Sequence, residues 1–204
     1  MSKKLLSCVI CLLCLTFAVA AEGQTRAKRN TPSATRNEGA SISLVAANQV
    51  TVGQTITVEI QVNLGTVKYD DGTPVVLGGY QVPIGYDSSI VEFVGAEGGE
   101  TPTFSKKPIA TNPDTANQKG IVIATAFTTD NSPSMSSLSV ARLTFVSKKT
   151  GAAVFTIDPE GTPQHAMIAS QLHNKGTVTI PATYKNAAVS INTVKRTAKT
   201  ATKP

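Results

Sequence analysis

The chain has 204 residues, with 19 Lys and Arg against 13 Asp and Glu, a formal net charge of +6, and 41% hydrophobic residues. Its three cysteines, Cys8, Cys11 and Cys14, all lie near the N-terminus. The remainder of the chain therefore cannot form disulfides, a cysteine nucleophile or a thiolate-zinc site, and a hydrophobic core must stabilise it.

The N-terminus has the pattern of a secretory signal peptide. Lys3 and Lys4 precede an apolar run from Leu5 to Phe17, and small residues follow it, which predicts a signal peptide over residues 1–20 with cleavage after Ala20. The run is shorter than the roughly 20 apolar residues that span a bilayer. We therefore expect no membrane span after cleavage, and a protein that is secreted or held at the cell surface or in the periplasm.

The positive charge is concentrated outside the central part of the chain. Between Gly39 and Asn192 there are nine Lys and Arg against eleven Asp and Glu, a net charge of −2. A nucleic-acid-binding domain would need a basic face of its own, so nucleic acid is excluded as a partner. The polar flanks predict a disordered linker over 21–39 and a basic disordered tail over 193–204. Attachment of these flanks to an anionic envelope is the alternative.

Residues 40–192 predict a single all-β domain. In Gln54–Gly65, apolar residues at every second position alternate with polar ones, which is typical of a strand with one buried face. Asp71-Gly72 predicts a hairpin turn, and Thr162–Asn174 predicts at most one or two helical turns. Further strands are expected over Tyr80–Tyr86, Ile90–Ala96, Gly120–Thr128, Leu138–Ser147, Ala152–Asp158 and Gly176–Ile191. About nine short strands separated by turns predict an antiparallel β-sandwich.

The sequence offers little for metal binding. His165 and His173 are the only histidines, and no carboxylate is placed to complete a zinc site of three or four ligands. No metal site or cofactor is therefore predicted. The oxygen-rich loop Thr128–Ser134 leaves open whether a calcium ion binds there.

Catalytic motifs are also lacking. The chain has no G-x-S-x-G sequence. Glu92, Glu97 and Glu100 cluster near one predicted strand end, but nothing indicates the cleft that a pair of glycosidase carboxylates needs. The sequence therefore predicts a protein that is not an enzyme.

Aromatic residues that could stack on sugars are few. The chain has no Trp and four Tyr. Tyr80 and Tyr86 have the inward parity of their predicted strand, which leaves Tyr69 and Tyr184 as possible glycan contacts.

The order of several short motifs resembles the cohesin domain family over about Ile42 to Ile191. The matching pieces are Val52-Gly53-Gln54, Gly79-Tyr80, Tyr86-Asp87, Ile90-Val91-Glu92, Leu143-Thr144-Phe145 and Gly151. The resemblance implies a nine-stranded jelly-roll sandwich related to carbohydrate-binding modules. It also implies a non-catalytic receptor for dockerin modules in extracellular, polysaccharide-degrading complexes, with calcium carried by the dockerin.

The resemblance further implies that the strand Gly79–Tyr86 lies in the dockerin-binding face. Its predicted outward residues and the corner that follows form the candidate site: Gly79, Gln81, Pro83, Gly85, Asp87 and Ser88. Asp87 is expected to cap the turn through its carboxylate. Pro83 predicts an edge strand, a bulge, or a position whose N–H would have faced outward in any case. A carbohydrate-binding or envelope and adhesion module on the same sandwich is the alternative function.

Overall fold

A computed structural model describes residues 34–35, 39–129, 137–173 and 176–193, and the structural statements below concern these residues. The predicted signal peptide, most of the predicted linker, the tail after residue 193 and residues 130–134 of the candidate calcium loop lie outside this part. Residues 34–35 fall within the predicted linker and form a short strand there.

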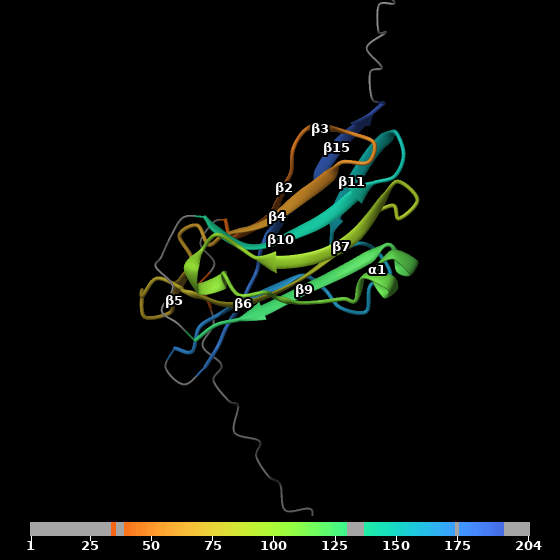
Figure 1. Cartoon of the computed structure of the whole chain (residues 1–204). Helices are drawn as coiled ribbons and strands as arrows, with labels where there is room; N and C mark the ends of the chain where they lie inside the picture. The colour runs from red at the N-terminus through yellow and green to blue at the C-terminus, as the bar shows by residue number, and fades with distance from the viewer. Residues whose placement is uncertain (1–33, 36–38, 130–136, 174–175, 194–204) are drawn as a thin grey trace, which may run out of the picture. The chain divides into compact units, whose positions relative to one another are not determined.

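Two sheets form the sandwich that the sequence predicts. The five-stranded sheet has the order β14-β2-β4-β10-β7. The strands of this sheet are β2 (Ser41–Val45), β4 (Thr55–Asn63), β7 (Val91–Gly98), β10 (Leu138–Ser147) and β14 (Thr183–Lys185). Figure 1 shows β4, β10 and β7 side by side in one layer, with β6 and β9 in the other.

The eight-stranded sheet has β6 near its centre, flanked by β9 on one side and by β12 and β11 on the other. Its strands are β3 (Gln49–Thr51), β6 (Leu77–Gly85), β8 (Ile109–Ala110), β9 (Ile121–Phe127), β11 (Gly151–Ile157), β12 (Met167–Ser170), β13 (Thr179–Ile180) and β15 (Ala187–Asn192). A separate two-stranded sheet joins β1 (Ala34–Thr35) to β5 (Lys68–Tyr69).

The sequence-based assignment needs three corrections. The sandwich is not purely antiparallel, because β14 pairs with β2 and β15 pairs with β3 in parallel. The segment Thr162–Asn174 contains the strand β12 rather than helical turns, since pairing with β6 overrides its weak helical pattern. The helix α1 (Pro113–Lys119) and the 3-10 helix η2 (Pro102–Phe104) were not predicted.

The short helix α1 has local signals at both ends. The Asn112 side chain accepts a hydrogen bond from the Asp114 N–H (3.0 Å), and Pro113 follows it at the first helical position. Gly120 ends the helix with φ 67°, a conformation that favours glycine. The Asn-Pro-Asp sequence is thus a start signal, but seven residues are too few for helical periodicity to show it.

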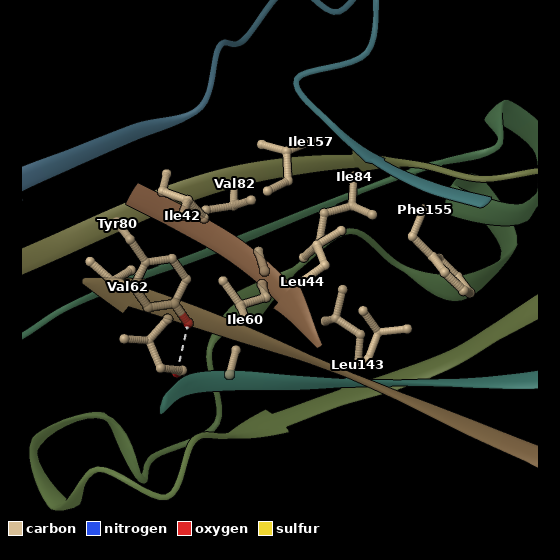
Figure 2. Packing of buried hydrophobic residues seen from close by; sticks show 14 of the residues in the cluster. Ile42, Leu44, Ile60, Val62, Tyr80, Val82, Ile84, Leu143, Phe155 and Ile157 are labelled. Carbon is tan, nitrogen blue, oxygen red and sulfur yellow. Dashed lines mark hydrogen bonds between the residues drawn. The ribbon is translucent and has the colours of Figure 1, made fainter. Parts of the chain in front are cut away.

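One hydrophobic core fills the space between the sheets. Ile42, Leu44, Ile60 and Val62 of the five-stranded sheet face Tyr80, Val82 and Ile84 of the eight-stranded sheet (Figure 2). The Tyr80 hydroxyl is satisfied within this core, because it donates to the Val140 carbonyl oxygen (3.2 Å).

Phe145 lies where aromatic rings from both sheets meet. Its ring centroid is 4.8 Å from that of Phe155, 5.0 Å from that of Tyr86 and 5.4 Å from that of Phe93. Such offset and edge-on pairs add to the free energy of burial, so these residues tie the two sheets together.

Candidate functional site

The strand β6 has the predicted alternation of inward and outward residues. Tyr80, Val82 and Ile84, together with Tyr86 just after the strand, are buried in the core. Burial raises the pKa of both tyrosine hydroxyls, so both remain hydrogen-bond donors at neutral pH.

The opposite face of β6 is less open than the sequence predicts. Gly79, Pro83 and Gly85 are buried and Gln81 is half-buried, so the predicted exposure is wrong for the first three. These residues are buried because β6 has strand partners on both sides and because residues 158–166 lie across its outer face.

Pro83 lies in a central strand, so the edge strand is wrong among the alternatives predicted for it. It is opposite Ile123 of β9, and its carbonyl oxygen accepts a hydrogen bond from the Asp158 N–H (3.0 Å) on the other side. Because the N and C=O of a strand residue point to the same neighbour, the missing N–H of Pro83 faces the place where β11 ends. The proline therefore costs one ladder bond at a natural break in pairing.

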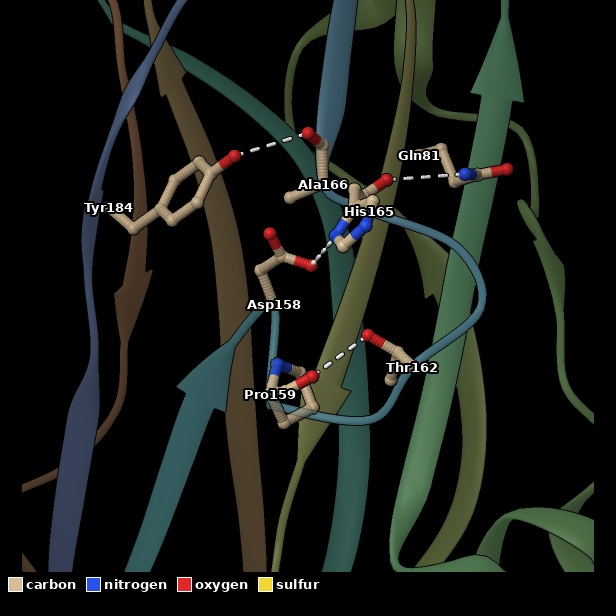
Figure 3. A network of polar contacts seen from close by, with 7 residues as sticks. All are labelled: Gln81, Asp158, Pro159, Thr162, His165, Ala166 and Tyr184. Atoms are coloured by element: carbon tan, nitrogen blue, oxygen red, sulfur yellow. Dashed lines mark hydrogen bonds and ion pairs between the residues drawn. The ribbon is translucent and has the colours of Figure 1, made fainter.

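Residues 158–166, here called the strap, connect β11 to β12 across the outer face of β6 (Figure 3). Gln81 Nε2 donates to the His165 carbonyl oxygen (3.3 Å). A Cβ on Gly85 would lie 2.9 Å from Pro159 Cβ. The strap thus covers the middle and one end of β6, and a glycine at position 85 permits its close approach.

Internal bonds fix the shape of the strap. Asp158 adopts φ 53°, and its Oδ1 lies 3.1 Å from Nδ1 of the exposed His165. Thr162 Oγ1 donates to the Pro159 carbonyl oxygen (2.8 Å). At the far end, the Tyr184 hydroxyl donates to the Ala166 carbonyl oxygen (3.1 Å).

Exposed apolar side chains surround the strap on the neighbouring strands. Four residues form a row across neighbouring strands, in the order Ile109, Thr125, Gln81 and Met167. Because residues directly opposite each other point to the same side, these four share one side of the sheet. The side chains on this side include Phe127 (79% exposed), Ile109 (72%), Val154 (50%) and Met167 (42%), with Ile121 and Ile123 half-buried. We call these six residues the outer apolar face.

None of the six residues of the outer apolar face was predicted from the sequence to belong to the site. Ile121 and Ile123 alternate with the buried Val122 and Ala124, so both sides of β9 are apolar. A strand that is apolar on both sides indicates either burial by another layer or an exposed binding surface, and this signal was present in the sequence.

The corner after β6 has the predicted geometry. The exposed Asp87 caps the turn, because its Oδ1 accepts a hydrogen bond from the Ser89 N–H (2.8 Å). Hydrogen bonds from the Ser89 side chain and from its backbone N–H lower the pKa of Asp87. Ser88 is half-buried, and its carbonyl oxygen accepts from Lys148 Nζ (3.0 Å).

Two hollows border the outer apolar face. One holds about 300 Å³ between residues 102–109 and 125–129. The other is wider and more open, and Asp87, Gly85, Ile121 and Val154 are among the residues that line it. The structure therefore brings two of the predicted site residues together with apolar residues that were not predicted.

The two predicted glycan contacts differ in exposure. Tyr69 is 4% exposed, and its ring stacks on His173 with centroids 4.0 Å apart, so its predicted availability is wrong. Tyr184 is 44% exposed, but its hydroxyl is bonded to the strap.

The two histidines contact separate carboxylates. His173 Nε2 is 2.7 Å from Asp71 Oδ2, and His165 contacts Asp158. Within the described ranges, no three His, Asp or Glu side chains lie close enough together to hold a metal ion. In the same part of the chain, no helix has the length and apolar character to cross a membrane.

A comparison with protein families finds no match for the chain, and neither does a comparison with curated proteins. Solved structures do match. The seventh ScaB type I cohesin of Pseudobacteroides cellulosolvens aligns with a TM-score of 0.53 at 15% identity, over 77% of this chain and 96% of that one. The fold is that of a cohesin module.

Two further cohesins extend the comparison. The sixth cohesin of Acetivibrio cellulolyticus scaffoldin B, solved in complex with a mutant Cel5 dockerin, aligns with a TM-score of 0.56 at 14% identity, over 76% of this chain and 100% of that one. The cohesin module of a Clostridium perfringens family 33 glycoside hydrolase aligns with a TM-score of 0.54 at 11% identity, over 78% and 100%.

The motifs that resemble cohesins occupy structural positions in this cohesin fold. Gly53 makes the turn between β3 and β4 with φ 85°, and Gly151 begins β11 with φ 142°. Tyr86 and Asp87 end β6 and form its corner. The quoted pieces are thus turns and core positions, which explains how they indicate the fold while leaving the outer apolar face unspecified.

Proposed function

We propose that this protein is a secreted, non-catalytic interaction module that docks a partner module of the dockerin type on its outer apolar face. The cohesin fold supports the kind of partner, since the Acetivibrio cellulolyticus cohesin was solved with a dockerin on it. The apolar run after Lys3 and Lys4 supports secretion.

The exposed apolar side chains on the eight-stranded sheet carry this proposal. Phe127, Ile109 and Val154 are each at least half exposed, and they share one side of a sheet with Met167. Exposed apolar patches mark interaction sites, and a few side chains near the centre of a protein–protein interface supply most of its binding free energy.

We expect the partner, rather than this chain, to bind the calcium that the complex needs. The cohesin resemblance implies a calcium-loaded dockerin, so we expect the complex to dissociate when calcium is chelated while this protein stays folded.

The test is capture of the partner from the extracellular proteins of the source organism, with the immobilised chain in buffer that contains calcium. We expect a dockerin-type module to be retained, released by chelation, and lost when Phe127→Asp or Val154→Asp is immobilised instead. Thr57→Asp, on the exposed side of β4, is the matched control and should capture normally.

Retention of the chain on insoluble polysaccharide, with no protein partner captured, would contradict the proposal. That result would favour the carbohydrate-binding alternative, with Phe127 and Tyr184 as the exposed aromatic side chains.

A further inference from the structure

The smaller hollow on the outer apolar face has the features of a slot for an extended chain. It lies between residues 102–109 and the end of β9. The aromatic ring of Phe127 and the side chain of Ile109 stand exposed beside it, while Phe104 is buried. Apolar side chains therefore line the slot both from β9 and from residues 102–109.

The edge of β9 is open in this slot. Thr128 N–H donates to the Gly78 carbonyl oxygen of β6 (2.8 Å). Because alternate residues of an antiparallel strand point to opposite neighbours, the N–H and C=O of Phe127 point away from β6, toward the slot. The short strand β8 pairs with β9 only as far as Thr125, which lies opposite Ile109, so it does not reach Phe127. In the described part of the chain, no backbone group is hydrogen-bonded to Phe127 on that side.

Two exposed lysines give the slot a positive charge. Lys106 and Lys107 line it, and neither belongs to an ion pair with a described residue. Arg142 on the other sheet differs, since its guanidinium lies 3.9 Å from Glu97 and 3.7 Å from Glu100. The lysines are thus available to carboxylates of another molecule.

We propose that this slot binds a short, extended, acidic segment of a partner polypeptide as an added strand on the edge of β9. The segment would exchange backbone hydrogen bonds with Phe127, rest apolar side chains on Phe127 and Ile109, and direct Asp or Glu side chains to Lys106 and Lys107. Strand addition of this kind draws affinity from backbone hydrogen bonds and specificity from alternate side chains.

The inference extends the proposed function, because it assigns the segment to the protein that docks on the outer apolar face. Its test uses this chain with a synthetic peptide. A negative result would reject peptide binding in the slot, while the docking face would still be tested separately by the capture experiment.

The probe is a hexapeptide of alternating aspartate and valine, titrated into the full isotope-labelled chain while backbone amide signals are recorded by NMR. We expect the amides of Phe127 and its neighbours to shift, with the weak affinity of a short segment. The matched peptide of alternating lysine and valine should cause no such shift. Added salt should weaken binding, because the charges are exposed.

Charge reversal provides the second arm. The double variant Lys106→Glu, Lys107→Glu should bind the acidic peptide about tenfold more weakly, as expected for two exposed ion pairs. Lys185→Glu, an exposed lysine of β14 in the other sheet, should bind it as the unmodified chain does.

Three results would overturn the inference: equal shifts with both peptides, shifts that avoid residues 102–109 and 125–129, or no shift at all. Shifts of the same amides with polygalacturonate but not with the acidic peptide would also overturn it, and would assign the slot to an acidic polysaccharide.

Discussion

The outer sides of the two sheets differ although their inner sides share one core. On the five-stranded sheet, Thr55, Thr57, Glu59 and Gln61 alternate with the buried residues of β4. On the eight-stranded sheet, the corresponding side holds the outer apolar face and the strap. The exposed residues on the two outer sides both face water, so burial during folding does not account for the difference between them.

The two outer sides differ in how well they suit an isolated chain in water. Hydroxyl and charged side chains keep the exposed side of the five-stranded sheet solvated, as is usual for an antiparallel sheet with one wet side. Leaving Phe127 and Ile109 exposed gives no comparable benefit to the isolated chain. This difference supports the proposal that a second molecule covers the outer apolar face.

The largest predicted effect concerns the core that the two sheets share. Tyr86→Ala removes a buried ring that packs on Phe145, so we expect a loss of about 3–5 kcal/mol in the free energy of unfolding, measured by urea denaturation. Tyr86→Phe keeps the ring and loses only the hydroxyl that donates to Asn117 (2.9 Å), and should cost about 0.5–1.5 kcal/mol. Equal losses for the two variants would show that the ring is not part of the core.

The next prediction compares one glycine on each sheet. Gly85→Ala places a Cβ 2.9 Å from Pro159 Cβ and should destabilise the chain by about 1–3 kcal/mol, because the strap must move. Gly95→Ala on β7 finds no atom within 4 Å and should stabilise it by about 0.5–1 kcal/mol. Thermal unfolding of both variants checks this, and a neutral Gly85→Ala would mean that the strap does not rest on β6.

The smallest prediction concerns ion pairs. The Thr73 N–H and the His173 side chain, which both bond to its carboxylate, hold the pKa of Asp71 well below its usual range. A lowered pKa in the folded state contributes stability above the unfolded value of about 3.9 and loses it as pH falls further. We therefore expect Tm to fall less between pH 6 and pH 2 in Asp71→Asn than in the unmodified chain.

The matched variant for this prediction is Arg142→Gln on the five-stranded sheet. Its ion pairs with Glu97 and Glu100 are long and exposed, and such pairs contribute about 0–1 kcal/mol. Its Tm at neutral pH should change little. An Asp71→Asn profile that follows the unmodified chain at every pH would mean that the carboxylate does not titrate with folding.

Much of the fold could be predicted because period-two alternation in strands such as β4 and β10 reflects burial directly. The strand β12 within Thr162–Asn174 could not be predicted, because its conformation depends on pairing with β6, which is distant in sequence. The parallel pairs at β14 and β15 depend on the same kind of long-range pairing.

The candidate site was predicted in part. The parity of β6 and the cap by Asp87 depend on neighbouring residues, and both predictions are confirmed. The burial of Gly85 depends on Pro159, which is distant in sequence, so local pattern could not reveal it. That a partner contacts the six predicted site residues stays a prediction for all of them: Gly79, Gln81, Pro83, Gly85, Asp87 and Ser88.

Methyl-group NMR of the chain with its captured partner tests the docking face most directly, because both sheets carry outward methyl groups. We predict that signals of Ile109, Ile123 and Val154 shift when the partner binds, while those of Val45 and Val94, which are exposed on the five-stranded sheet, stay in place. Shifts at Val45 and Val94 with none at Ile109, Ile123 and Val154 would contradict the account.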